Sequence, residues 1–118
     1  MNMNDLNAWL VTHGFRIAAN QFRRDMNDCD WYAYRRSNIP ARECETNDGK
    51  PAQIVVYPSS FTFDGRLHES VEVEVCGEAS GVWWKLQAYS LSPADVPEKL
   101  STVEESLIAA WNALKVAP

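Results

Sequence analysis

A chain of 118 residues has room for one hydrophobic core and not two, because a globule of this size buries only about two thirds of its unfolded surface. Hydrophobic residues make up 46% and charged residues 23%, a composition that excludes an intrinsically disordered chain. The net charge of −5 lies wholly in residues 61–118, which carry four basic and nine acidic side chains. A protein that coats nucleic acid along its whole length is therefore excluded as well.

The N-terminal residues predict a short helix over about residues 4–13. Asn4 or Asp5 can cap this helix, apolar residues recur in it at helical spacing, and Gly14 supplies a left-handed stop. Residues 15–28 fit an alternating strand and a helical face equally well, so both alternatives stay open.

The next segment predicts antiparallel strands. A strand rich in aromatic residues is expected from Trp31 to Ser37. The turn sequence Asn47-Asp48-Gly49 then favours a hairpin between residues 42–46 and 52–57.

The longest connection without predicted structure lies at residues 58–69. Pro58 is expected to end the preceding strand, and Phe61-Thr62-Phe63 is read as a short apolar piece. Asp64-Gly65 marks a turn.

The clearest predicted hairpin pairs residues 70–76 with residues 82–90 across the loop Glu78–Gly81. One register matches every pair in polarity, whereas a one-residue slip would break that agreement. Its pairs are Gly77 with Val82, Val75 with Trp84, Glu74 with Lys85, Val73 with Leu86, Glu72 with Gln87 and Val71 with Ala88.

A last helix is predicted to begin near Pro97, where the missing N–H of proline costs nothing. Its apolar stripe consists of Leu100, Val103, Leu107, Ala110, Trp111 and Leu114. The charged residues Glu98, Lys99, Glu104 and Glu105 fall outside that stripe.

The order of these elements predicts a single α+β domain over residues 1–118. An antiparallel meander of four to five strands is expected, with the N-terminal and C-terminal helices packed on one face. The start of the chain lacks the features of a secretory signal, and no segment approaches the ~20 apolar residues that span a bilayer, so a cytoplasmic protein without membrane contact is predicted.

The cysteines predict reduced, structural thiols. Cys29, Cys44 and Cys76 are odd in number and share no CxxC spacing, which disfavours both a disulfide framework and a zinc site. The glycines are scattered singly, and neither a nucleophile elbow nor an HExxH sequence is present. We therefore expect no metal and no cofactor.

The first functional hypothesis is a non-enzymatic protein-interaction module of the accessory or inhibitor type. On the predicted register, Glu72, Glu74, Trp83 and Tyr89 share the sheet face away from the helices, and an aromatic group framed by acids is typical of a partner-binding patch. The expected partner is a protein, a basic one by charge complementarity, or a second copy. The alternatives are that Trp83 is buried and that Glu74 only meets Lys85 across the hairpin.

The second hypothesis is nucleic-acid binding by the stretch from Arg16 to Arg42, in which arginines and tyrosines interleave. Arginine forks bind phosphate, and aromatic rings stack on bases. The candidate residues are Arg23, Arg24, Tyr32, Tyr34, Arg35 and Arg36. These arginines can equally be solvated charges paired with the aspartates at positions 25, 28 and 30.

A small hydrolase or transferase is the third hypothesis. Glu72 and Glu74 project to the same face and could serve hydrolysis. A cysteine, most simply Cys76, could instead be activated by His13 or His68.

Overall fold

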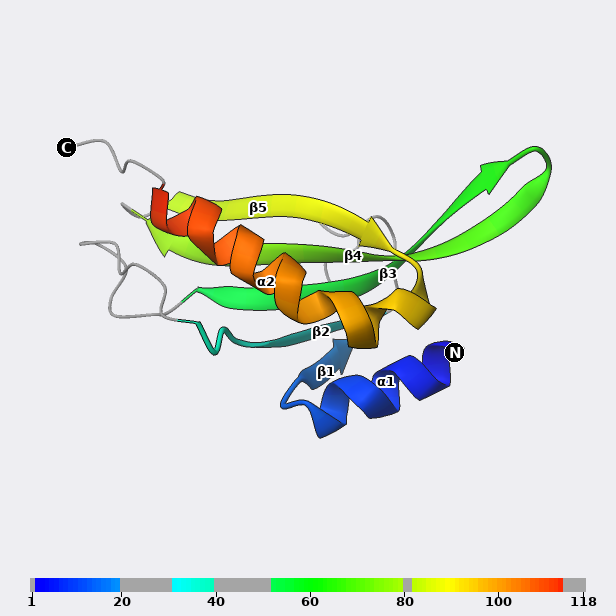
Figure 1. The fold of residues 1–118 in the computed structure, drawn as a ribbon, viewed down its shortest axis with the longest axis horizontal. Helices are drawn as coiled ribbons and strands as arrows, with labels where there is room; N and C mark the ends of the chain where they lie inside the picture. The colour runs from blue at the N-terminus through cyan, green and yellow to red at the C-terminus, as the bar shows by residue number, and fades with distance from the viewer. Residues whose placement is uncertain (1, 20–30, 40–51, 80–81, 114–118) are drawn as a thin grey trace.

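The computed structural model describes residues 2–19, 31–39, 52–79 and 82–113 (Figure 1). Its helices are α1 (Met3–Thr12), the 3₁₀ helix η1 (Pro93–Asp95) and α2 (Val96–Ala113). Its strands are β1 (Arg16–Ala19), β2 (Trp31–Arg36), β3 (Gln53–Phe63), β4 (Arg66–Ala79) and β5 (Val82–Leu91). They form one antiparallel sheet in the order β1-β2-β3-β4-β5. The predicted α+β meander with a helix at each end is confirmed.

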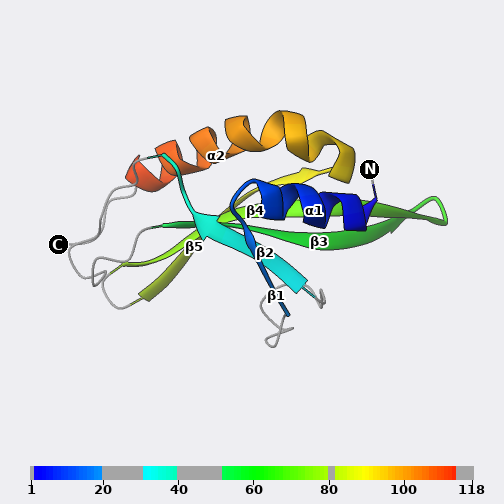
Figure 2. The same ribbon diagram turned by 90° about the horizontal axis from the view of Figure 1, so that it is seen from below.

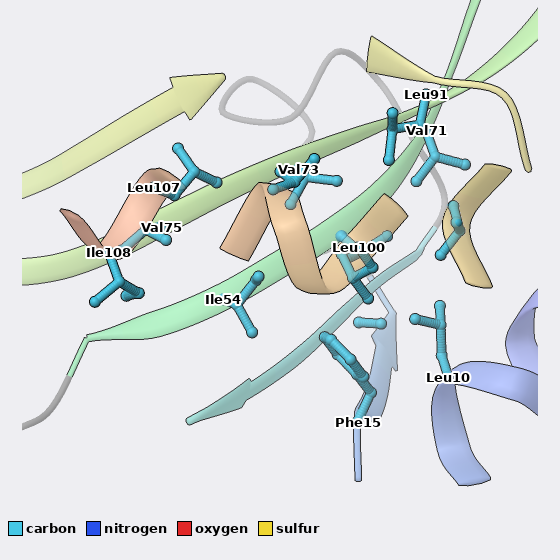
Figure 3. Close-up of a cluster of buried hydrophobic side chains, with 14 of the residues drawn as sticks. Leu10, Phe15, Ile54, Val71, Val73, Val75, Leu91, Leu100, Leu107 and Ile108 are labelled. Atoms are coloured by element: carbon cyan, nitrogen blue, oxygen red, sulfur yellow. The ribbon is translucent and has the colours of Figure 1, made fainter. Parts of the chain in front are cut away.

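Both helices cover the same face of the sheet (Figure 2). Alternate residues of the strands point to that face, because successive side chains of a strand point to opposite sides. The core is built from Leu6 and Leu10 of α1, Leu100, Leu107, Ile108 and Trp111 of α2, and Ile54, Val56, Val71, Val73 and Val75 of the sheet. Figure 3 shows part of this cluster. We call this helix-covered part of the molecule the body.

The first helix begins at Met3, and its N-cap lies two residues before Asn4, the first of the two predicted caps. Asn2 is the N-cap: its side chain accepts a hydrogen bond from the backbone N–H of Asp5 at 2.8 Å, and the Asp5 carboxylate accepts one from the N–H of Asn2 at 3.4 Å. Asn4 and Asp5 were therefore the wrong caps, because this reciprocal capping box satisfies two orphan donors at once. Gly14, with a φ of +88°, ends the helix as predicted. The open alternatives for residues 15–28 resolve to a strand at 16–19, and residues 20–28 lie outside the described residues.

The prediction that Pro58 ends its strand is wrong, because β3 continues through it to Phe63. The last pair between β2 and β3 is Ala33 with Val56, whereas β3 stays paired with β4 as far as Phe63 with Arg66. Pro58 lies beyond the last residue of β3 that pairs with β2, so among the described strands this part of β3 pairs with β4 alone, and proline is tolerated at such an edge. The proposed partner strand at 42–46 and its turn lie outside the described residues.

The predicted register of the second hairpin is wrong by two residues. Gly77 pairs with Trp84 instead of Val82, and Val75 pairs with Leu86. A shift of two keeps every side chain on its predicted face, so polarity matching does not detect it. A β-bulge between Val73 and Glu74 then changes the pairing again, and Val73 lies opposite Tyr89.

The last helix follows its predicted stripe with two exceptions. Leu100, Val103, Leu107 and Trp111 are buried, Ala110 is exposed, and Leu114 lies outside the described residues. Glu104, predicted to be outside the stripe, is buried.

Candidate functional site

The four residues of the predicted binding face do not gather on one exposed surface. Glu74 is only 1% exposed, and Glu72 is half-buried. The backbone of Trp83 pairs with Glu78 near the β4–β5 turn, and its side chain lies outside the described part. The bulge places the backbone of Tyr89 opposite Val73, and its side chain also lies outside the described part.

Glu74 lies inside a small polar cluster on the face away from the helices. The Tyr57 hydroxyl donates a hydrogen bond to Oε1 at 2.7 Å, and the Cys76 thiol donates one to Oε2 at 3.7 Å. Lys85 Nζ lies 3.5 Å from Oε1. The ion pair between Glu74 and Lys85 therefore forms, although the two residues are diagonal neighbours and not a direct pair. Partners on both carboxylate oxygens are what a buried charge needs.

Cys76 is a free, buried thiol beside that carboxylate. Burial, reinforced by the charge of Glu74 and the hydrogen bond to it, raises the pKa of Cys76 to about 12. A nucleophilic cysteine needs its thiolate, so this surrounding opposes the catalytic hypothesis for Cys76. His68 is eight residues away along the same strand, about 26 Å at strand rise, and does not reach it.

His13, the other proposed partner of a cysteine, is used within α1. Its ring stacks on Trp9 with the centroids 3.9 Å apart. Nδ1 donates a hydrogen bond to the Trp9 carbonyl oxygen at 2.7 Å.

Arg35 is used by the fold. Its guanidinium donates two hydrogen bonds to Glu104, at 3.1 and 2.7 Å, and lies over the Phe15 ring at 4.7 Å. Glu104 also accepts hydrogen bonds from the Ser37 hydroxyl at 2.7 Å and from the Asn38 N–H at 3.3 Å. The two-pronged pair fastens α2 to the end of β2, and it explains why a charged residue is buried on α2.

The rest of the proposed nucleic-acid surface is only partly described. Tyr32 and Tyr34 are half-buried, with ring centroids 5.7 Å apart, and pack against Val55, Tyr57 and Cys76. Arg36 is exposed, and Arg23 and Arg24 lie outside the described residues. The structure thus removes Arg35 from this candidate set and leaves Arg36 as its exposed cation.

A different surface emerges where β3 and β4 run beyond the helices and the other strands (Figure 1). We call residues 59–70 the arm, which extends from the pair Ser59 and Ser70 to the pair Phe63 and Arg66. Phe63 is 64% exposed and Leu67 is 69% exposed. The arm lies along the longest dimension of the molecule, 48 Å against 28 and 25 Å for the others.

Asp64 and Gly65 form the two-residue turn at the tip of the arm. Their φ values of +50° and +72° are those of the hairpin turns that Asp-Gly favours, as the sequence predicts. The sequence also offers the apolar residues on both sides of this turn. Because Pro58 was expected to end its strand, the pairing of residues 59–63 with residues 66–70, and therefore the arm, was not predicted.

No protein family, curated protein or solved structure matches this chain. Within residues 2–19, 31–39, 52–79 and 82–113, no three His, Cys, Asp or Glu side chains are grouped as a metal site would require. None of the described helices is both long and apolar enough to cross a membrane.

Proposed function

We propose that this chain is a protein-interaction module, of the accessory or inhibitor type, that binds a protein partner through the arm. The observation that carries the proposal is the exposure of Phe63 and Leu67 on a hairpin that leaves the body. Each exposed apolar side chain forgoes roughly 25 cal/mol for every Å² that burial would remove from water. A partner that covers the tip recovers this free energy.

The free state of the arm supports the same proposal. A two-stranded ribbon is at best marginally stable in water, and no other strand among the described residues pairs with the arm, whereas β2 and β5 support β3 and β4 in the body. Aromatic and aliphatic anchors that fit a pocket contribute most of the free energy in protein interfaces. Glu72 and Glu69 lie toward the base of the arm, where they would add charge complementarity to a basic partner.

Nucleic-acid binding has less support, because Arg35 is occupied by Glu104 and the arm carries two carboxylates, at Asp64 and Glu69, against one arginine, Arg66. The test separates the two functions. The full chain is immobilised and offered extract of its native host, one half of it treated with nuclease and the other half untreated. Every captured protein is then purified and titrated against the chain by calorimetry.

We expect a saturable complex of fixed stoichiometry that survives nuclease. Retention of nucleic acid alone, with an affinity that falls steeply as salt rises, contradicts the proposal.

A further inference from the structure

The arm exposes apolar side chains on both of its faces. Phe63 pairs with Arg66 across the hairpin, so these two side chains share one face of the ribbon. Leu67 is the next residue along β4, and successive side chains of a strand point to opposite faces. The face of Phe63 also holds His68, whose ring centroid lies 6.4 Å from that of Phe63.

This two-sided arrangement sets the shape of a matching site. A flat partner surface covers one face of a ribbon and leaves the other in water. A cleft whose two walls enclose the ribbon covers both Phe63 and Leu67. Only the cleft removes both apolar side chains from water. It is therefore the more favourable shape, because the hydrophobic effect grows with the apolar area that is buried.

The charge at the tip sets the chemistry of that site. Asp64, at the apex of the turn, is exposed and would enter the site first. A carboxylate moved out of water needs an opposite charge or hydrogen-bond donors. The floor of the cleft must therefore present a cation or a group of N–H donors, whereas the hydrocarbon of a lipid bilayer offers neither.

A second copy of this chain is a poorer match. Each copy has a net charge of −5, so two copies repel. In the described ranges, the large hydrophobic side chains exposed outside the arm are Val11 and Ile17, which lie on different elements, α1 and β1, and do not form one apolar cleft. At the tip Asp64 and Arg66 balance each other in charge, but the net charge of the whole chain favours a different, basic protein.

We propose that the arm inserts tip-first into an apolar cleft of a different protein, with Phe63 and Leu67 on opposite walls and Asp64 facing a basic group at the floor. This inference rests on the proposed function and adds the shape and charge of the partner site. A chain that fills such a cleft excludes the cleft's other ligands.

The test uses the full chain with the photoreactive residue p-benzoylphenylalanine placed, in separate variants, at Phe63, Leu67 and Val11. Val11 is the matched control, because it is 57% exposed and lies on α1, away from the arm. We expect the Phe63 and Leu67 probes to cross-link one and the same protein. Peptide mapping should place the two cross-links on facing walls of one cleft, and the Val11 probe should not label that cleft.

Affinity for the purified partner then gives the second readout. We expect Phe63→Ser and Leu67→Ser each to weaken binding at least about tenfold, as loss of a buried anchor does. Asp64→Asn should weaken binding several-fold and flatten its salt dependence, and Val11→Ser should leave it unchanged. Thermal melts of each variant confirm that the body is folded, since all four residues are exposed.

Cross-links between copies of this chain would overturn the inference in favour of self-association, and cross-links from one probe alone would overturn the cleft. A captured partner whose affinity is the same for the wild type, Phe63→Ser and Leu67→Ser overturns the inference and leaves the proposed function standing. Failure of the full chain to bind any purified protein overturns both.

Discussion

The strands β3 and β4 each pass through two regions with opposite surroundings. In the body, Ile54 of β3 and Val73 of β4 are fully buried, whereas in the arm Phe63 and Leu67 are mostly exposed. All four are apolar residues in regular antiparallel pairing. Position along the strand, and not residue type, therefore decides whether an apolar side chain stabilises the fold or remains available to a partner.

The largest expected contrast between body and arm is in thiol reactivity. With Cys29→Ser and Cys44→Ser as background, Cys76 reports on the body, and a further Thr62→Cys substitution reports on the arm. The pKa of Cys76, raised from 9.0 to about 12, lowers its thiolate fraction near pH 8 by roughly a thousandfold. We expect iodoacetamide, followed by peptide mass spectrometry, to label the arm thiol faster by at least that factor, and equal rates in denaturant.

The same pKa gives a pH dependence. Because the folded state keeps the thiol proton that the unfolded chain releases near pH 9, the contribution of Cys76 to stability is complete below pH 9.0 and is lost as the pH rises toward about 12. In the iodoacetamide experiment, equal labelling rates for Cys76 and the Thr62→Cys thiol in the native protein would show that the body does not protect Cys76.

The next effect concerns the pair that fastens α2 to β2. Glu104→Ala leaves the Arg35 guanidinium buried without its partner, so we expect a loss of about 3–5 kcal/mol in the free energy of unfolding. The neighbouring exposed residue gives the matched control, and Glu105→Ala should change stability by no more than about 0.5 kcal/mol. Urea denaturation measures both, and similar values for the two variants would disprove a stabilising role for the pair.

One strand allows the body and the arm to be compared directly. Ile54→Ala should lower the free energy of unfolding by about 2–5 kcal/mol, because it opens a cavity in the core. Phe63→Ala, on the same strand, should change it by no more than about 0.5 kcal/mol, although it removes a larger side chain. A large loss for Phe63→Ala would mean that the Phe63 side chain stabilises the folded state, and it would weaken the assignment of the arm to binding.

The smallest of these effects tests how tightly the body is packed. A Cβ added at Gly77 would lie 2.7 and 2.8 Å from two atoms of the buried Trp111 ring. We expect Gly77→Ala to cost about 1–3 kcal/mol through overpacking. Trp111→Phe removes both of these atoms, so Gly77→Ala should cost less in that background. Equal costs in the two backgrounds of this double-mutant cycle would show that the ring is not the obstacle.

Local sequence rules predicted the elements whose causes are local. The helix over α2, the strand over β2, the Gly14 stop and the Asp64-Gly65 turn depend on spacing, capping or φ preference within a few residues. The class of the fold followed from their order. The two-residue shift in the register of the β4–β5 hairpin was not predicted, because such a shift leaves each side chain on the same face and polarity matching depends only on the face.

The remaining differences have causes distant in sequence. Pro58 is accepted in β3 because the pairing of β3 with β2 stops at Val56, and the sequence of β3 does not contain that fact. Glu104 and Glu74 are buried because Arg35 and Tyr57, 69 and 17 residues away, supply their hydrogen bonds. Strand alternation and helical periodicity predict that charged residues are exposed. They therefore placed the carboxylates of Glu74 and Glu104 wrongly on the surface, and Glu74 was part of the predicted binding face.

The turn at Asp64 and Gly65 has a consequence for the order in which the chain folds. Its two-residue loop costs little closure entropy, and a hairpin of this kind forms in about 1–10 μs. We expect β3 and β4 to nucleate the sheet from this end, with β2 and β5 and then β1 added outward from this hairpin. At Gly65 an added Cβ meets nothing within 4 Å, but φ is +72°, so Gly65→Ala strains the turn alone. It should slow refolding and hardly change the unfolding rate, and the reverse result in a chevron experiment would place nucleation elsewhere. A tip kept free for a partner would thereby also set how quickly each newly made chain reaches its native state.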